Sequence, residues 1–273
     1  MTQRWNGGRD SYRPAGEPID PSRYGVEVLA DDTRARAFVE THHYSGSYPA
    51  ARVRVGLYRM SELVGVAVFS VPAQQAAIPH WTGTSDGVEL GRFVLAQDVP
   101  ANGETWFLAR AFAALTSELP DCKAVLSYSD PMPRRRADGT LVTPGHIGTI
   151  YQAHNGRHLG VARSETLYLD RDAKTVSRRS LSKIRNEERG AEGAYQRLLE
   201  AGAPPRNPGE APSAYVDRAL REGPFRRVKH PGNLVYVWGV GRQARATSKG
   251  FGAAQPYPRR ATDPRAPQLA LCA

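Results

Sequence analysis

Two β-prone runs separated by a short polar turn constrain the fold of this chain more than any other feature. Residues 52–58 and 63–71 are rich in Val, Leu, Ala and Phe, and residues 59–62 between them are polar. Runs of this length joined by a short turn predict an antiparallel β-hairpin. A lone hairpin is not stable in water, so the rest of the chain must supply more strands or a helix to cover it.

The remaining pattern predicts which elements cover the hairpin. Asp31 or Asp32 can cap a helix over residues 31–42, and apolar residues at helical spacing predict a second helix over residues 102–119. The segment "GHIGTIYQAHNG" indicates a short helix or turn. An antiparallel start followed by a β-α-β unit predicts an α/β (α+β) fold, with a mixed central sheet flanked by helices, as in GNAT-type acyltransferases. The further strands are predicted at residues 87–97, 123–130, 164–170 and 232–240.

Composition divides the chain into three parts. Residues 1–24 are rich in Gly, Pro, Arg and Asp and are expected to form a flexible arm. Residues 25–240 are expected to form one GNAT-like catalytic domain with a basic C-terminal portion, interrupted by a Pro/Gly-rich loop at residues 201–214. Residues 241–273 are expected to be a disordered basic tail.

The positive charge is concentrated in the last third of the chain. The net charge is +10, and residues 171–273 hold 20 Lys and Arg against 9 Asp and Glu, whereas residues 1–170 hold 17 against 18. A basic segment on a near-neutral body favours a polyanion such as a nucleic acid as the partner. The alternative is a basic tail that only keeps the protein soluble.

Other features exclude several classes of protein. No run of 18 apolar residues exists, so a membrane span is not expected, and the first residues lack the apolar stretch of a secretory signal. Two cysteines provide no disulfide framework and no Cys-rich zinc site. We therefore expect a cytoplasmic protein.

Three polar clusters follow predicted elements and are candidates for a functional site. In an open α/β sheet, ligands bind where strands end, and "SYSD" directly follows the apolar "AVL" of a strand. Each cluster also has a plain structural explanation, because histidines cap helices, an Asp before Pro opens turns, and Tyr151 can be a core residue. Arg92 is the exception, because an arginine among apolar strand residues must be paired or hold an anion. The clusters are His42, His43, Tyr44 and Ser45; Ser127, Tyr128, Ser129 and Asp130; and His146, Tyr151, Gln152 and Asn155.

Four sequence blocks occur in an order that is typical of one family. The blocks "HHYSGS", "ELGRFVL", "SYSD" and "GHIGTIYQAHNGRHLG" together resemble the Mom DNA-modification proteins of phage Mu and related phages, over roughly residues 28–240. The resemblance implies a GNAT-like fold and an enzyme that adds a carbamoylmethyl (acetamido) group to N6 of adenine in phage DNA, which protects that DNA from host restriction. By motif, it implies catalytic roles for His43, Tyr44, Arg92, Ser127, Asp130 and Tyr151, with His146 beside them.

The chain departs from the family pattern at two places. A segment with Arg134, Arg135 and Arg136 separates Asp130 from His146, and these arginines are candidates for DNA phosphate contacts. Before the central helix, "QDVPANGETW" has one glycine where acetyltransferases carry a Gly-rich pyrophosphate loop, so coenzyme A binding in the usual manner is in doubt. The candidate cofactor-binding residues there are Asn102, Gly103 and Thr105, and the further DNA-binding candidates are Arg178, Arg179 and Lys183.

The implied product also bears on the cofactor. A carbamoylmethyl product joins N6 to a methylene carbon, whereas acyl transfer from a thioester joins it to a carbonyl carbon. This mismatch favours a redox-active metal or an unusual acyl or glycyl donor. His43, Asp130 and His146 offer the two histidines and one carboxylate that non-haem iron accepts, so we expect an iron site.

Double-stranded DNA with an extruded adenine is therefore the expected partner. Two other functions remain open from the sequence. One is an ordinary N-acetyltransferase that uses acetyl-CoA on a small amine or a protein. The other is a basic DNA-binding protein without catalytic activity.

Overall fold

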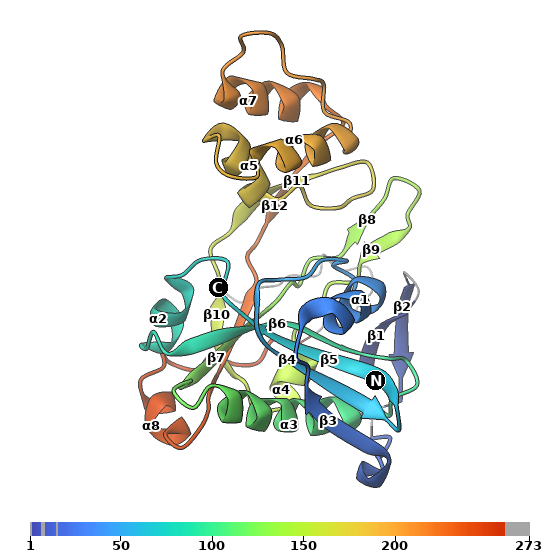
Figure 1. Cartoon of the computed structure of the whole chain (residues 1–273), viewed down its shortest axis with the longest axis vertical. Coiled ribbons are helices and arrows are strands. Elements are labelled where there is room, and N and C mark those ends of the chain that lie inside the picture. Colours follow the sequence, from blue (N-terminus) through green and yellow to red (C-terminus); the bar gives the residue numbers. More distant parts are fainter. Residues whose placement is uncertain (1, 7–8, 15, 260–273) are drawn as a thin grey trace. The chain divides into compact units, whose positions relative to one another are not determined.

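The computed structural model describes residues 2–6, 9–14 and 16–259, and it confirms the predicted class of a mixed central sheet flanked by helices (Figure 1). The seven strands of the sheet are β3 (Tyr24–Val28), β4 (Ala51–Arg59), β5 (Glu62–Ser70), β6 (Gly87–Leu95), β7 (Ala124–Ser129), β10 (Arg157–Val161) and β13 (Leu234–Gly239). Their spatial order is β10-β13-β7-β6-β5-β4-β3. Neighbours run antiparallel except β6 and β7, which are parallel.

The predicted hairpin is confirmed with boundaries within one residue. Strand β4 pairs with β5 from Ala51↔Ser70 to Arg59↔Glu62. Met60 in the turn has φ 56, a left-handed conformation that lets the chain reverse within two residues.

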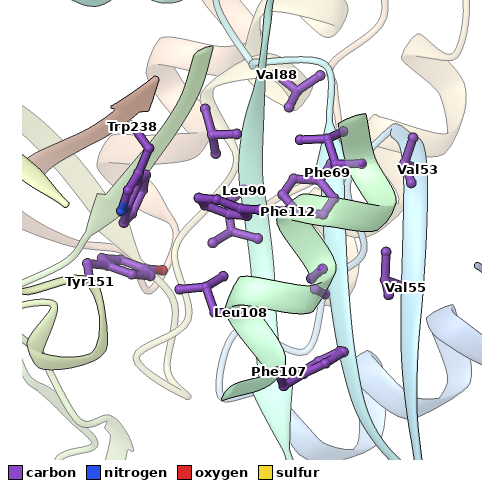
Figure 2. Packing of buried hydrophobic residues seen from close by; sticks show 14 of the residues in the cluster. Val53, Val55, Phe69, Val88, Leu90, Phe107, Leu108, Phe112, Tyr151 and Trp238 are labelled. Carbon is purple, nitrogen blue, oxygen red and sulfur yellow. The ribbon is translucent and has the colours of Figure 1, made fainter. Parts of the chain in front are cut away.

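Helices cover both faces of the sheet. Helix α3 (Gly103–Glu118) packs Phe107, Leu108 and Phe112 against Phe69 and Leu90 on one face, as Figure 2 shows. Helix α1 (Asp32–His42) covers the other face through a second apolar cluster that includes Ala35, Val39, Val66 and Val68. The other helices near the sheet are η1 (Pro21–Arg23), α2 (Ala77–Thr82), α4 (Thr149–Ala153) and α8 (Ala244–Lys249).

Helix α1 begins directly after one of the two capping residues that the sequence predicted. The Asp31 side chain accepts a hydrogen bond from Thr33 N–H at 2.8 Å, so Asp31 rather than Asp32 is the cap. The helix ends where His43 N–H donates to the Val39 carbonyl at 2.9 Å. Among the described helices, none combines the length and the apolarity needed to cross a membrane.

The middle of the sheet opens between β6 and β7. Their parallel pairing covers only Gly87–Glu89 and Ala124–Leu126, although both strands continue beyond it. On its other side β6 carries a β-bulge, because Arg92 pairs with Val68 and Leu90 pairs with Phe69, which leaves Gly91 as an extra residue. A Cβ at Gly91 would lie 2.5 Å from Ser70 Oγ, so the bulge requires glycine.

The N-terminal segment differs from the predicted flexible arm. Strands β1 (Thr2–Asn6) and β2 (Arg9–Arg13) form an antiparallel hairpin. Arg4 explains this order, because it is 6% exposed and its Nε lies 2.6 Å from Oε1 of the buried Glu104. Its Nη1 donates to the Ala96 carbonyl at 2.6 Å and its Nη2 to the Val99 carbonyl at 3.2 Å. A charge pair at this depth fixes the hairpin to the start of α3.

The chain divides into two compact units, each described by itself. The sheet unit comprises residues 1–131, 145–162 and 233–273, and the insert unit comprises residues 132–144 and 163–232. We call the two segments of the insert unit, residues 132–144 and 163–232, the excursions. A backbone hydrogen bond of the sheet unit joins the two ends of each excursion. His146 N–H donates to the Asp130 carbonyl at 2.8 Å around the first, and Ala162 N–H donates to the Asn233 carbonyl at 2.8 Å around the second.

The insert unit has its own secondary structure and its own core. Its strands are β8 (Arg134–Arg135), β9 (Leu141–Thr143), β11 (Glu165–Leu169) and β12 (Arg226–His230), and its helices are α5 (Arg178–Arg185), α6 (Ala191–Glu200) and α7 (Pro212–Glu222). The predicted strand at residues 164–170 is β11, and it pairs with β12 rather than with the central sheet. The helices bury an apolar cluster made of Leu181, Ile184, Ala194, Leu198, Ala203, Tyr215, Val216, Ala219 and Leu220.

The segment after β13 also differs from the predicted disordered tail as far as residue 259. Gln255 N–H donates to the His158 carbonyl at 2.8 Å, and a ring nitrogen of His158 lies 2.8 Å from the Pro256 carbonyl. Strand β10 is at the edge of the sheet, so its outer backbone groups are available for hydrogen bonds. The contacts of Gln255 and Pro256 hold the segment beside this strand. Residues 260–273 of the predicted tail lie outside the described residues.

Candidate active site

The predicted polar clusters of the sheet unit meet where β6 and β7 separate. Past the last parallel pair, the hydroxyl of the fully buried Ser127 donates to the Leu90 carbonyl at 3.0 Å. Tyr151 enters this region from α4, and its phenol lies close enough to Ser127 for that hydroxyl to influence its pKa. The opening between two diverging strands gives side chains from three separate segments access to one place.

A row of four rings lies at this opening. The Tyr44 phenol oxygen is 3.1 Å from Nε2 of His146. The ring centroids of His43 and Tyr44 are 4.3 Å apart, and those of His146 and Tyr151 are 6.4 Å apart. Two backbone contacts hold His146 at the end of β7: its N–H bonds to Asp130, and its carbonyl accepts from Ser129 Oγ at 2.7 Å. The first and third predicted clusters are thereby brought together, with the end of the second beside them.

His43 is held as a neutral imidazole. Its Nδ1 accepts the Ser45 backbone N–H at 3.1 Å and lies 2.8 Å from Ser45 Oγ. A backbone N–H can only donate, so the ring proton belongs on Nε2. Burial, together with the positive charges of Arg92 and His146, holds the pKa of His43 well below its usual range. A neutral imidazole of this kind can accept a proton once its environment changes.

Arg92 lies on the bulge and is fastened to the loop after α1. Its Nε donates to the Ser47 carbonyl at 2.8 Å, and its Nη2 to the Ser47 hydroxyl at 2.7 Å. Burial lowers the pKa of Arg92, while Tyr44, Glu89 and Tyr151 act to raise it. Within the described part of the chain, no carboxylate forms an ion pair with Arg92, so its charge is available to an anionic group of a ligand.

Glu89 is a site residue that the sequence analysis missed. Burial raises its pKa above the usual carboxyl range, with Arg92 opposing that shift. A carboxylate with a raised pKa beside an arginine is a candidate general base. The sequence signal for it is an acidic residue inside the apolar strand "GVELGRFVL", three residues before Arg92.

Tyr151 and Ser127 belong to the core as well as to the site. The Tyr151 ring packs 5.4 Å from the Tyr236 ring and 5.6 Å from the Trp238 ring, centroid to centroid, and Figure 2 shows it beside Leu108 and Trp238. Burial raises the pKa of the Tyr151 phenol, so the group is held as a neutral hydrogen-bond donor. Tyr151 is therefore a core residue, and its catalytic role stays a prediction.

The predicted iron ligands do not form a ligand set. Among the described residues there is no group of three or more His, Cys, Asp or Glu side chains placed to hold a metal ion. His146 offers Nε2 to Tyr44, and His43 uses Nδ1 to accept from Ser45. His43, Asp130 and His146 as arranged here do not fit an iron site, and iron stays a prediction without a ligand set in the structure.

The start of α3, where coenzyme A pyrophosphate was considered, is filled by protein groups. Asn102 N–H donates to the Glu17 carbonyl at 3.1 Å, Gly103 N–H to the Pro100 carbonyl at 2.9 Å, and Thr105 Oγ1 to the Asn102 carbonyl at 3.3 Å. Glu104 is 4% exposed against Arg4, and burial raises its pKa to about 7. The first amide groups of α3 are thus already hydrogen bonded within the protein, beside a buried carboxyl group, which disfavours a phosphate there, and binding of a cofactor by Asn102, Gly103 and Thr105 stays a prediction.

The predicted DNA-binding residues all lie in the insert unit. Arg178 and Arg179 on α5 form ion pairs with Glu165 and Glu188, respectively, and Arg136 pairs with Asp172 at 3.1 Å. Arg135 donates to the Gly139 carbonyl at 2.9 Å, and Arg134 donates to Thr143 Oγ1 at 3.2 Å. Lys183 lies in the last turn of α5, and DNA binding by all six residues stays a prediction.

The chain is similar to known proteins in sequence and in structure. A family model described as the Mom protein family matches residues 26–205, a range that includes all four sequence blocks. Among solved structures, a tandem GNAT protein from the clavulanic acid biosynthesis pathway, without acetyl-CoA, is similar with 10% identity and a TM-score of 0.34, covering 83% of this chain and 82% of that chain. No curated protein matches the chain.

Proposed function

Because the chain belongs to the Mom protein family, whose members modify phage DNA, we propose that it is a transferase that adds a carbamoylmethyl group to N6 of adenine in DNA. One observation supports this proposal most strongly: the Tyr44 phenol contacts His146 near the opening between β6 and β7, and Arg92 lies close enough to Tyr44 and to Glu89 for their charges to influence its pKa. A protein that only bound DNA would have no use for buried titratable groups at a strand opening.

The target amine must first leave the duplex, because N6 of adenine is paired inside it. Extrusion of the base costs a few kcal/mol, and the extruded base then stacks on aromatic side chains in a pocket. Tyr44 is the candidate for this stacking, because it is half-buried and its edge contacts Trp5 at a centroid distance of 6.4 Å. Phosphate contacts elsewhere on the protein offset the cost of opening the duplex.

The transfer then requires a base and an electrophile. The lone pair of N6 is delocalised into the ring, so N6 is a weak nucleophile, and removing its proton as the bond forms assists the attack. In the proposed step, N6 bonds to the methylene carbon of an activated carbamoylmethyl donor, and the bond from that carbon to its leaving group breaks. The leaving group takes the bonding electron pair, and the N6 proton moves to the Glu89 carboxylate.

Arg92 and His43 are the other residues proposed to act in this step. Arg92 is placed to stabilise the negative charge that develops on the leaving group, as cationic side chains do in transfer reactions. His43, which is neutral and holds its ring proton on Nε2, is the second candidate for the proton acceptor only if its Nδ1 contact to Ser45 breaks. Tyr44 and Tyr151 supply neutral phenol donors that orient His146 and the bound base.

The donor is proposed to bind without the pyrophosphate contact that coenzyme A makes in acetyltransferases. The closed start of α3 supports this, since Arg4 and Glu17 occupy the surroundings of its first amide groups. An activated carbamoylmethyl compound remains the proposed donor class. The proposed biological outcome is protection of the modified DNA from restriction enzymes.

Mass spectrometry of nucleosides tests the function directly. DNA from a host that expresses the chain is digested to nucleosides, and a deoxyadenosine with the mass of a carbamoylmethyl adduct is the expected product. The variant Glu89→Gln keeps the size of the side chain and removes the base, so the product should fall at least tenfold with the protein still folded. Unmodified nucleosides together with turnover of acetyl-CoA would instead establish an ordinary N-acetyltransferase.

A further inference from the structure

The insert unit carries most of the net positive charge of the protein, +7 of +10. Residues 132–144 and 163–232 hold 18 Lys and Arg against 11 Asp and Glu. Much of the charge on its helices and on the loops that join them is compensated locally by ion pairs between side chains. These pairs are Arg178–Glu165, Arg179–Glu188, Arg185–Asp217, Arg206–Glu187 and Arg218–Glu210.

The ribbon formed by β11 and β12 differs from the helices in this respect. Arg226, Arg227 and Lys229 on β12 are all exposed, and no carboxylate forms an ion pair with them among the residues that the structure describes. Across the ribbon they face uncharged residues, because Arg227 pairs with Tyr168 and Lys229 with Thr166. Their positive charge is therefore not compensated.

A fourth cation extends this surface from β8. Arg226 Nη2 lies 3.5 Å from the Arg135 carbonyl, which places the start of β12 beside β8. Arg135 is exposed, and its own guanidinium donates to the Gly139 carbonyl rather than to a carboxylate. Side chains alternate along a strand, so Arg227 and Lys229 lie on one face of the ribbon, while Arg226 lies on the other face beside Arg135. We call these four cations on the two faces of the ribbon the ribbon patch.

We propose that the ribbon patch is the surface with which the insert unit binds the phosphate backbone of DNA. The choice of DNA as the partner rests on the proposed function. A phosphate that approaches α5 must compete with Glu165 and Glu188 for Arg178 and Arg179, whereas at the ribbon patch the cations contact backbone carbonyls at most and no carboxylate of the described residues competes for them. Two-stranded ribbons also fit the groove and backbone of a duplex. The arginines of α5 then serve to hold the insert unit together.

Salt dependence of DNA binding separates the ribbon patch from α5. The logarithm of the binding constant falls with the logarithm of salt concentration, with a slope of about 0.9 per phosphate neutralised. In the full chain, the triple variant Arg226→Gln, Arg227→Gln, Lys229→Gln should lower the magnitude of this slope by about 2 to 3. The matched control removes the same number of charges from α5, as Arg178→Gln, Arg179→Gln, Arg185→Gln, and should lower it by less than about 1.

Two further measurements keep the test decisive. The charge-preserving variant Arg226→Lys, Arg227→Lys, Lys229→Arg should retain the slope of the unchanged protein, which separates loss of charge from loss of folding. An equal or larger slope change in the α5 control, or an unchanged slope in the ribbon variant, would overturn the proposal. The nucleoside assay is scored separately: if the unchanged protein modifies no adenine but the slopes differ as stated, the proposed function fails and the ribbon patch stands.

Discussion

The phenol oxygen of Tyr44 lies 3.1 Å from Nε2 of His146, and this contact joins two segments that are 102 residues apart in the chain. Tyr44 follows the end of α1, whereas His146 is fixed to the end of β7 by two hydrogen bonds. The contact orients the His146 imidazole. The Tyr151 ring lies near the same imidazole, with the two ring centroids 6.4 Å apart. Such a positioning contact affects the geometry of the site more than the stability of the fold.

Tyr44→Phe should therefore slow adenine modification with little effect on folding. A hydrogen bond of this kind contributes about 0.5–1.5 kcal/mol, which corresponds to a roughly 2–10-fold lower rate. The matched control is Tyr58→Phe, the same change at a tyrosine of β4 on the α1 face of the sheet. Modified deoxyadenosine is quantified at equal protein levels, and equal losses in both variants would refute the positioning role.

Gly91→Ala should destabilise the sheet unit at the bulge. The new methyl group would lie 2.5 Å from Ser70 Oγ and 3.2 Å from Pro49 Cγ, and overpacking of this kind costs about 1–3 kcal/mol. Ser70→Ala in the same chain removes the nearest atom and should restore most of the free energy of unfolding. Urea unfolding of the two single variants and the double variant measures this coupling, and additive effects would contradict the steric explanation.

Glu104 should make the protein less stable as pH rises from about 4.5 to 7. Burial raises the pKa of its carboxyl group from 4.5 to about 7, so the folded chain binds more protons than the unfolded chain in this window. Relative to Glu104→Gln, the unchanged protein should lose on the order of 3 kcal/mol between pH 4.5 and 7. Glu118→Gln, at the exposed end of the same helix, is the control and should leave the pH profile unchanged. Urea unfolding at several pH values gives the profile, and a stability difference that does not vary with pH would show that Glu104 is ionised throughout.

Coenzyme A should not bind at the start of α3. A ligand present at 100 times its dissociation constant adds about 2.7 kcal/mol to the free energy of unfolding, which raises Tm by several degrees. We expect no rise in Tm with millimolar coenzyme A, because Glu17, Glu104 and Arg4 occupy the helix start. An acetyltransferase in the same thermal assay serves as the positive control. A reproducible rise that Arg4→Met alters would contradict the closed helix end.

Local sequence signals predicted the elements whose partners are close in the chain. The β4–β5 hairpin and α1 follow from turn residues, a capping Asp31 and apolar spacing, all of which act within a few residues. The N-terminal hairpin could not be predicted in this way. Its short polar strands are held by Arg4, whose partner Glu104 is 100 residues distant.

The candidate site shows the same limit. Strict alternation along β6 would place residues 89 and 92 on opposite faces, so the local sequence does not predict that their side chains lie close together. The bulge at Gly91 shifts the alternation by one residue and brings the two charges close enough to influence each other. The space at the bulge is limited by Ser70 on the neighbouring strand, which the sequence around Gly91 does not reveal. The four motif blocks identified the segments that come together near this opening, but not the orientation of their side chains.

The two hydrogen bonds at Asp130–His146 and Ala162–Asn233 close the sheet unit at the bases of both excursions. Each strand of the central sheet therefore keeps its neighbours whether or not an excursion is present. Descendants of one ancestral gene can lengthen, shorten or replace these appendages without rebuilding the catalytic framework. Differences among members of the family are then expected to concentrate in residues 132–144 and 163–232, while the opening between β6 and β7 changes slowly.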